Sequence, residues 1–562
     1  MNRARLLTGI LAAAFVLLLG IAAVGFMRAD APPHAAALTG TVSSQAEGPM
    51  EGVLVGAKMV GSPIGVWVVS DAQGRYSFPG DRIQPGKYNI AIRAVGYELP
   101  RTSVDVTDSA AHLDLQLNKV ATTNKLASQL TNVEWRNSVP GTPQEKAALG
   151  CSTCHTLQRI MFSHYDADEM VTVLQRMATH TNNSSPLHPW VRPAEGPAPA
   201  PTPRMIAQAK YIASVNLSAQ DSFSFPLKTL PRPTGKATQV IYTTYDLPRI
   251  DAEPHDTQMD ADGNVWYSDF TSQYIGKLDP RTGKVTDYQV PLARTGPLAQ
   301  GGLQIVLDKQ GRVYYGNMSQ MQIARLDPKT GKIDTFKLPV ADDKIGSAHL
   351  TMIDPNSQDV DGQLWINVAE GTEESGGTYH IDLAKNMWTR VTYPAGSPSA
   401  RAYDVVANSQ NNMYGMNMGN NKIWMTDGKT LKTTWFDLTL KNAGCRRGHI
   451  DSQDRLWCGD FTGDGLAMFD PKTQKVTEWP APTAGMWPYD AEYDDKAYTW
   501  FSGMESDLAV RFNPKTGEFV QYLLPHDTNV RHVDVQKSGD LSSLWLGDQH
   551  SNLIIHIEPL TP

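Results

Sequence analysis

Two cysteines and a histidine in the first third of the chain have a spacing that suits covalent attachment of a cofactor. Cys151 and Cys154 are separated by two residues, and His155 follows directly. Thiols at this spacing on one helical turn add to both vinyl groups of a haem, and the adjacent imidazole becomes the proximal iron ligand. A thioredoxin-like redox site would require a βαβ unit around the cysteines, and a zinc site would require further ligands nearby; the sequence predicts neither. We therefore expect haem c at these three residues.

The sixth iron ligand has several candidates. Our preferred ligand is Met177, which ends a helix predicted over residues 166–177. A methionine ligand favours a higher reduction potential and pure electron transfer, whereas a second histidine changes both potential and spectrum. Methionines at helical spacing are also common core residues. The alternatives are Met161, Met170, His164 and His180.

A second set of polar residues stands at the starts of predicted inner strands in the C-terminal half. Its candidate catalytic members are His255, His349, Tyr403, Arg447, Tyr489 and His532, with Asp256, Asp404, Asp490 and Asp534 beside several of them. Converging titratable groups indicate a functional pocket, for a small-molecule substrate or a redox partner protein. The plainer alternative is that each side chain satisfies hydrogen bonds at a strand end.

Register sorts these side chains further. Each of His255, Tyr403, Arg446 and Tyr489 lies 11 residues before an aromatic residue that recurs along the chain. His449 lies three residues out of that register, so we expect its side chain to face elsewhere.

The elements that position this second set are repetitive. A turn-and-acid step such as Leu278-Asp279-Pro280 recurs seven times, at intervals of 43 to 55 residues. An aromatic residue follows each hairpin turn in phase with it: Trp266, Tyr314, Trp365, Tyr414, Trp457, Trp500 and Trp545. Four-stranded units at this period are propeller blades, and ring closure removes exposed sheet edges. We predict a seven-bladed β-propeller over residues 237–562, with a strand over 239–245 completing the last blade.

Three other segments precede the propeller. Arg3 and Arg5 lead into an apolar run over residues 6–27, so residues 1–37 are expected to be a signal peptide or an inner-membrane anchor of a periplasmic protein. Residues 38–120 alternate as short strands between turns and predict a small β-sandwich. Residues 123–218 have a helical pattern and contain the Cys-x-x-Cys-His sequence, so we expect a small α-helical c-type cytochrome domain there, followed by a linker over residues 219–236. The predicted fold class is mainly β and multidomain.

Two segments resemble known families. Gly74-Arg75-Tyr76-Ser77-Phe78 and Pro85-Gly86-Lys87-Tyr88 resemble the carboxypeptidase regulatory-like domain, which implies a non-catalytic module. The segment around Leu149-Gly150 resembles small class I cytochromes c. In the propeller, Asp262-Gly263-Asn264-Val265-Trp266 and the stretch at 275–284 resemble virginiamycin B (streptogramin) lyase.

The lyase resemblance implies metal-assisted elimination, with a histidine base and a divalent ion such as Mg²⁺ in the propeller. The chain departs from that family because the acid it favours soon after the blade tryptophan is Glu. In this chain the corresponding positions are Asp269, Asn317, Asn367, Asn417, Asp460 and Asp548. The nearest glutamates are Glu370 and Glu505.

Composition narrows the function classes. The 562 residues are 41% hydrophobic and 19% charged, with a net charge of −8 and no basic block. Phosphate binding needs clustered positive charge, so a nucleic-acid partner is excluded.

The two remaining cysteines, Cys445 and Cys458, flank one predicted hairpin turn and are either a disulfide or buried thiols. We expect an exported haem protein of electron transfer; the alternatives are a lyase with an accessory haem domain and a non-enzymatic surface-binding protein.

Overall fold

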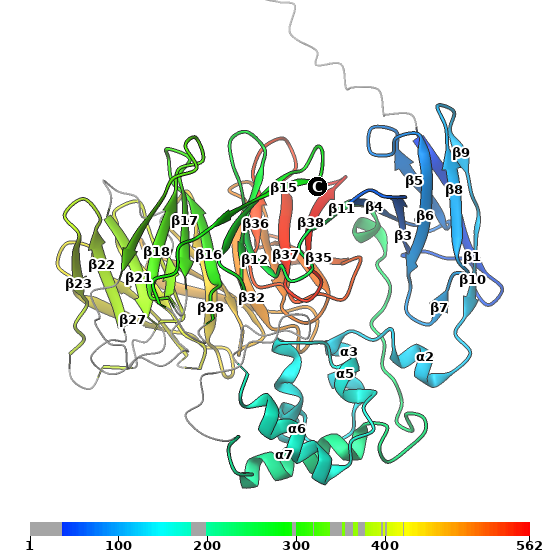
Figure 1. Cartoon of the computed structure of the whole chain (residues 1–562), viewed down its shortest axis with the longest axis horizontal. Helices are drawn as coiled ribbons and strands as arrows, with labels where there is room; N and C mark the ends of the chain where they lie inside the picture. The colour runs from blue at the N-terminus through cyan, green and yellow to red at the C-terminus, as the bar shows by residue number, and fades with distance from the viewer. Residues whose placement is uncertain are drawn as a thin grey trace, which may run out of the picture.

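The computed structural model describes residues 36–180, 198–294, 299–317, 320–337, 351–353, 363–368, 377–394, 397–398, 402–419 and 421–562. Most of this part of the chain is β-structure, as Figure 1 shows, and the helices gather between the first and the last strands in sequence. The predicted mainly β class is confirmed.

The C-terminal half forms six successive antiparallel sheets of four strands in the described part of the chain. They are β12–β15 (Pro254–Met259, Val265–Asp269, Tyr274–Asp279, Lys284–Gln289), β16–β19 (Gly302–Leu307, Val313–Asn317, Gln322–Leu326, Ile333–Lys337), β20–β23 (Thr351–Ile353, Gln363–Val368, Gly377–Asp382, Met387–Arg390), β24–β27 (Asp404–Ala407, Met413–Met416, Lys422–Thr426, Thr433–Asp437), β28–β31 (Cys445–Ile450, Leu456–Asp460, Gly465–Asp470, Lys475–Pro480) and β32–β35 (Pro488–Tyr493, Thr499–Gly503, Leu508–Asn513, Glu518–Leu523).

The seventh blade closes the ring with a strand from far upstream. Strands β36 (Asp534–Gln536), β37 (Ser543–Asp548) and β38 (Leu553–Pro559) are completed by β11 (Val240–Asp246), which pairs antiparallel with β38 from Val240 opposite Pro559 to Asp246 opposite Leu553. The first strand of each sheet contacts the first strand of the next, and β36 contacts β12. The predicted closing strand over 239–245 and the seven-bladed propeller are confirmed by this pairing.

The recurrent aromatic residues explain why the blades stack. All seven lie on the second strand of a blade and are at most 1% exposed, so each fills the space between neighbouring sheets. Burying a side chain of this size stabilises the fold by roughly 1.5–3 kcal/mol.

Several inner strands carry an irregularity near their start. The register of β12, β16, β28 and β32 with the second strand of the same blade shifts within the first residues, as between Cys445 and Gly448 in β28. A bulge inserts an extra residue, so two consecutive side chains face the same side of the sheet. This geometry decides which polar residues meet in the centre of the propeller.

The N-terminal strands form a sandwich that shares a sheet with the propeller. Its strands are β1 (Ala36–Ser44), β2 (Gly48–Pro49), β3 (Leu54–Met59), β4 (Ile64–Val69), β5 (Arg75–Pro79), β6 (Gly86–Arg93), β7 (Tyr97–Glu98), β8 (Thr102–Val106), β9 (Ala111–His112) and β10 (Leu115–Lys119). Strand β4 pairs with the free edge of β11, so the order β36-β37-β38-β11-β4-β3-β6-β8 runs through both units. The sandwich is therefore joined to the last blade by backbone hydrogen bonds.

In sequence, the helices follow the strands of the sandwich and precede β11 of the propeller. They are α2 (Thr123–Ala127), α3 (Asn132–Ser138), α4 (Pro143–Lys146), η1 (Ala147–Thr153), α5 (Gln158–Met161), α6 (Ala167–Met177) and α7 (Pro203–Val215), followed by η2 (Gly235–Thr238). Capping boxes begin α3, α4 and α6, each with a Glu three residues after the cap. The helix predicted over 166–177 is confirmed as α6, with Asp166 as its N-cap.

Figure 1 shows this helical segment, residues 123–215, against one end of the propeller. No helix of the described residues is long and apolar enough to cross a membrane. The apolar run expected over residues 6–27 lies outside the described residues.

Candidate functional site

The Cys-x-x-Cys-His turn is held at the end of a short helical run. Proline and a capping box start α4, η1 continues the chain through Cys151, and Cys154 caps η1 with its amide directed to the Cys151 carbonyl oxygen at 3.4 Å. Both thiols are free and half-buried. Burial raises the pKa of Cys151 to about 11 and raises that of Cys154 as well. The two sulfur atoms thus sit on one turn without being joined to each other.

The surroundings of the first cysteine are apolar. Cys151 packs against the apolar core of the helical segment, which includes Leu149, Leu157, Met161 and Ile212. Gly150, which precedes the first cysteine, is exposed, and a methyl group added there would meet no atom within 4 Å. The residues present therefore fit an apolar group attached at this turn.

The histidine of the turn also fits its expected role. The Nδ1 atom of His155 lies 3.1 Å from the Thr156 carbonyl oxygen. A proton held on Nδ1 by that carbonyl leaves Nε2 as the nitrogen able to ligate iron. Burial lowers the pKa of His155, which favours the neutral, ligating form.

The candidates for the sixth ligand lie in different environments. Met177 is 37% exposed at the end of α6, whereas Met161 and Met170 are buried in the helical core. His164 contacts the Leu217 carbonyl oxygen through Nδ1 at 2.9 Å, and Nδ1 of the exposed His180 lies 3.0 Å from the Arg176 carbonyl oxygen. The assignment of Met177 stays a prediction.

The Cys-x-x-Cys-His turn is docked on the propeller through its own backbone. Arg531 Nη2 donates to the Thr153 carbonyl oxygen at 2.6 Å, and Asn529 Nδ2 donates to the Ser152 carbonyl oxygen at 3.4 Å. Both propeller residues precede β36. Burial and the positive charges of Arg531 and His155 lower the pKa of His550 to about 3, as expected where these three side chains lie close together.

A buried ion pair strengthens this interface. Arg136 of α3 pairs with Glu505, which is completely buried, and also donates to the Ser152 hydroxyl at 2.5 Å. The Arg136 guanidinium lies 4.0 Å from the centre of the Trp487 ring. The helical segment is therefore held to the propeller by two sets of contacts: the ion pair of Arg136 with Glu505, and the hydrogen bonds from Asn529 and Arg531 to the backbone of Ser152 and Thr153.

The residues predicted to share one register do meet at this end of the propeller. The hydroxyl groups of Tyr403 and Tyr489 are hydrogen-bonded, and the Arg446 guanidinium lies 4.6 and 3.9 Å from the centres of their rings. Burial raises the pKa of both phenols. At Tyr403 the charge of Arg446, the hydrogen bond with Tyr489 and the charge of Arg531 together outweigh burial, so the pKa of Tyr403 is lowered while that of Tyr489 is raised. The His255 ring approaches Tyr489 edge-on at 6.3 Å.

A second polar layer is formed by the residues that directly follow those of the first layer in sequence: Asp256, Asp404 and Arg447. Arg447 donates two hydrogen bonds to Asp256, of 2.6 Å to Oδ1 and 2.7 Å to Oδ2, and His255 Nδ1 lies 2.5 Å from the same Oδ1. Arg447 also lies 3.8 Å from Asp404. Burial lowers the pKa of His255 to about 3, so this histidine is neutral beside an ionised aspartate.

A third group corrects the expectation for His449. Its side chain does not face elsewhere: Nε2 lies 3.1 Å from Asp490 Oδ2, and His532 Nε2 lies 3.8 Å from the same oxygen. Regular alternation of side chains would have turned His449 away, but the extra residue in the β28 bulge restores it to the channel face.

The acids noted after the blade aromatic residues have a structural role where they are described. Asp269, Asp460 and Asp548 are completely buried at the ends of their strands and accept hydrogen bonds from loop amides, such as Asn529 N to Asp548 at 3.0 Å. Two further candidates, His349 and Glu370, lie outside the described residues.

Sequence reasoning missed the residues that make the docking interface. Arg136, Glu505, Asn529 and Arg531 have no spacing that links them to Cys151, because the contacts join positions up to 378 residues apart. Of these four residues, sequence reasoning noted only Glu505, as one of the glutamates nearest to a blade aromatic residue.

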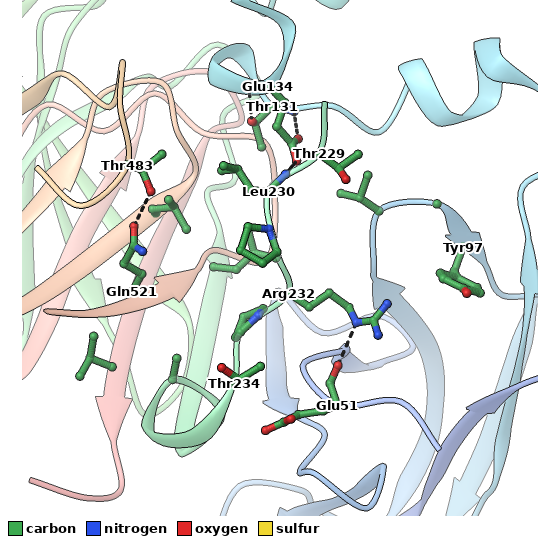
Figure 2. A pocket seen from close by; sticks show the side chains of 18 of the residues that line it. Glu51, Tyr97, Thr131, Glu134, Thr229, Leu230, Arg232, Thr234, Thr483 and Gln521 are labelled. Carbon is green, nitrogen blue, oxygen red and sulfur yellow. Dashed lines mark hydrogen bonds between the residues drawn. The ribbon is translucent and has the colours of Figure 1, made fainter. Parts of the chain in front are cut away.

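A cavity of about 900 Å³ lies where the three units meet. Figure 2 shows the segment around Leu230 and Arg232 crossing it, with Leu230 N donating to Glu134 at 2.6 Å and Arg232 Nε donating to the Glu51 carbonyl oxygen at 2.9 Å. The predicted linker is thus pinned to both the sandwich and α3.

Comparison with known proteins agrees with the N-terminal assignment. Residues 37–118 match the carboxypeptidase regulatory-like domain. No curated protein sequence matches the chain at a significant level.

Among solved structures, the chain is similar to virginiamycin B lyase from Staphylococcus aureus, with 17% identity over 57% of this chain and 99% of that one and a TM-score of 0.48. It is also similar to a streptogramin B lyase (18% identity, 58% and 99% covered, TM-score 0.46) and to the WD40 repeats of RRP9 (10% identity, 56% and 96% covered, TM-score 0.43). The chain therefore contains a carboxypeptidase regulatory-like domain, and the strand order of its C-terminal half is that of a seven-bladed propeller.

Proposed function

We propose that the chain is an exported c-type haem protein of electron transfer, with haem c bound covalently through Cys151 and Cys154 and its iron ligated by His155. The observation that carries the proposal is the docking of a free-thiol Cys-x-x-Cys-His turn on the propeller, through Arg531 at Thr153 and Asn529 at Ser152. When bound, the haem supplies reversible one-electron transfer.

The residues of this chain have distinct tasks in that function. The two thiols provide the covalent links, and the Thr156 carbonyl oxygen holds the proton on Nδ1 of the proximal histidine. Arg531 and Asn529 fix the peptide groups between the cysteines, so the propeller sets the position of the turn and places a buried positive charge beside it.

The burial of the polar side chains at the end of the propeller that contacts the Cys-x-x-Cys-His turn supports electron transfer over the lyase alternative. His255 and Tyr489 are completely buried and Arg447 is 2% exposed, and each is bonded to or packed against its neighbours. A lyase would need these side chains to face a substrate. Their packing favours a rigid polar support for the docked turn, with the redox partner reaching the haem domain from outside.

Covalent haem is the first property to test. The mature chain is produced in a periplasm with haem-maturation machinery, and spectra of the oxidised and dithionite-reduced protein are recorded before and after denaturation in acid acetone. We expect a c-type α-band that stays with the polypeptide. The double variant Cys151→Ser, Cys154→Ser is expected to lose it, while the matched variant Cys445→Ser, Cys458→Ser keeps it. Correctly folded, matured protein without covalent haem would refute the proposal.

A further inference from the structure

The channel of the propeller contains a second cluster of metal-binding side chains, separate from the cysteines. His449 of β28, Asp490 of β32 and His532 just before β36 come from three consecutive blades. One ligand atom from each lies within 4.8 Å of the other two, and the two imidazole rings are 5.4 Å apart. Closing such a triangle onto an ion with bonds of about 2.0–2.2 Å needs side-chain movements of roughly 1 Å or less.

The bulges of the inner strands create this convergence. In β32 the register shifts between Pro488 and Asp490, as it does in β28 before Gly448. The residue that completes each bulge, Asp490 or Arg447, then faces the channel together with the residue before it. Backbone amides hold the carboxylate in place, because Ala491 N donates to Oδ1 at 2.9 Å and Val533 N to Oδ2 at 3.2 Å.

One of the three side chains lacks the hydrogen bonds expected of a buried imidazole. His532 is 7% exposed, its Nδ1 atom has no hydrogen-bond partner, and its Nε2 atom stands 3.8 Å from Asp490. A buried polar atom without a partner costs about 1–3 kcal/mol unless a ligand compensates it. His449 has a side chain that is 26% exposed, which gives an ion access from the channel.

The charges around the cluster favour a cation. The nearby carboxylates are Asp256, Asp404, Asp490 and Glu492, against the cations Arg447 and Lys537. Arg447 is engaged by Asp256, and Lys537 by Glu492 and Asp495 at 3.1 Å each. In the described part of the chain, the ion-pair contacts of Asp490 are to His449 and His532. The cluster therefore has an excess of negative charge.

We propose that His449, Asp490 and His532 bind one divalent transition-metal ion of the Zn²⁺ or Fe²⁺ class, with its remaining coordination positions open to the channel. Two imidazole nitrogens and one carboxylate oxygen suit such ions, whereas Mg²⁺ prefers an all-oxygen shell. The Mg²⁺ expected from the lyase resemblance is therefore the wrong ion for these donors. The site needs no haem and goes beyond the proposed electron transfer.

Zinc binding to the full haem-loaded chain tests the proposal. The protein is treated with chelator, and Zn²⁺ is then titrated by calorimetry, with zinc counted by elemental analysis after gel filtration. We expect one Zn²⁺ per chain that millimolar Mg²⁺ does not displace. The single variants His449→Ala and His532→Ala are each expected to weaken binding at least tenfold, while His556→Ala, a matched buried histidine of the last blade, binds as the wild type does.

The result of the zinc experiment is distinguishable from that of the covalent-haem experiment, because the amount of bound zinc is measured independently of the α-band. Circular dichroism of each variant establishes that the blades are folded. Zinc binding that persists in both histidine variants, equal competition by Mg²⁺, or no zinc bound by the folded wild type would each overturn the site.

Discussion

Arg531 donates a hydrogen bond of 2.6 Å to the carbonyl oxygen of Thr153, one of the two residues between the cysteines of the Cys-x-x-Cys-His turn. The guanidinium is buried and its central carbon lies 4.9 Å from the centre of the Phe270 ring. A loop of the last blade thus binds the backbone of the Cys-x-x-Cys-His turn and brings a positive charge to it.

Replacing Arg531 by Ala is expected to leave covalent haem attachment intact and to lower the reduction potential. A positive charge close to the iron favours the ferrous state, so its removal shifts the potential down by roughly tens of millivolts. Spectroelectrochemical titration measures the shift. The exposed Arg75→Ala serves as control, and an unchanged or raised potential in Arg531→Ala contradicts the proposed placement of the haem.

The buried pair of Arg136 and Glu505 gives a second prediction. Glu505→Gln keeps the shape of the side chain but leaves the Arg136 charge buried without its partner, so the free energy of unfolding is expected to fall by about 3–5 kcal/mol. Urea denaturation measures this loss. Glu518→Gln, which breaks a pair with Lys236 whose side chains are 45 and 46% exposed, is the control, with an expected change of at most about 1 kcal/mol.

A double variant separates the charge from the contact. Replacing Arg136 by Met and Glu505 by Leu together removes both charges, and we expect most of the lost stability to return. If the double variant is as unstable as Glu505→Gln, the interface depends on the hydrogen bond from Arg136 to Ser152 rather than on the balance of charge.

The parts of the molecule that the sequence predicts well are those set by short-range periodicity. The aromatic residue of each blade and the capped helix at 166–177 repeat or terminate within a few residues, so local patterning locates both. His449 was misplaced because a one-residue bulge reverses the alternation on which the register count depends. Arg531 was not found, and Glu505 was noted only as a possible metal-ligating glutamate, since nothing near either residue in sequence indicates a contact with the helical segment.

The prediction of Met177 as sixth ligand has its own spectral test. Oxidised wild-type protein is expected to show a weak sulfur-to-iron band, which Met177→Ala loses together with a lowering of the potential. Met387→Ala, an exposed methionine of the propeller, keeps the band. A band that survives in Met177→Ala assigns the ligand to Met161 or Met170, and a wild type without the band points to His164 or His180.

The disulfide between Cys445 and Cys458 settles an alternative that the sequence left open. The two residues are paired with their Cα atoms 5.8 Å apart, across the bulge of β28. The double serine variant is expected to lose about 2–3 kcal/mol of unfolding free energy, because the bond closes a short loop in the unfolded chain. Urea denaturation with and without reductant measures it: reductant should reproduce the loss in the wild type and change nothing in the variant.

Asp548 is expected to make the free energy of unfolding depend on pH. It is completely buried, it accepts hydrogen bonds from Asn529 N and His550 N, and burial raises its pKa to about 7. Since this pKa lies above the unfolded value of about 3.9, the folded state binds the proton more tightly. The resulting stabilisation is fully present below about pH 4 and is lost as the pH rises through about 7.

The variant Asp548→Asn removes that titration while keeping an acceptor for the two amides. Its free energy of unfolding relative to the wild type is therefore expected to increase by about 2–4 kcal/mol between pH 4 and pH 8, with little further change at higher pH. Urea denaturation at four pH values measures the difference, and the exposed Asp540→Asn is expected to follow the wild type throughout. A relative stability of Asp548→Asn that is constant over this range would mean that the pKa of the carboxyl group is not raised in the folded protein.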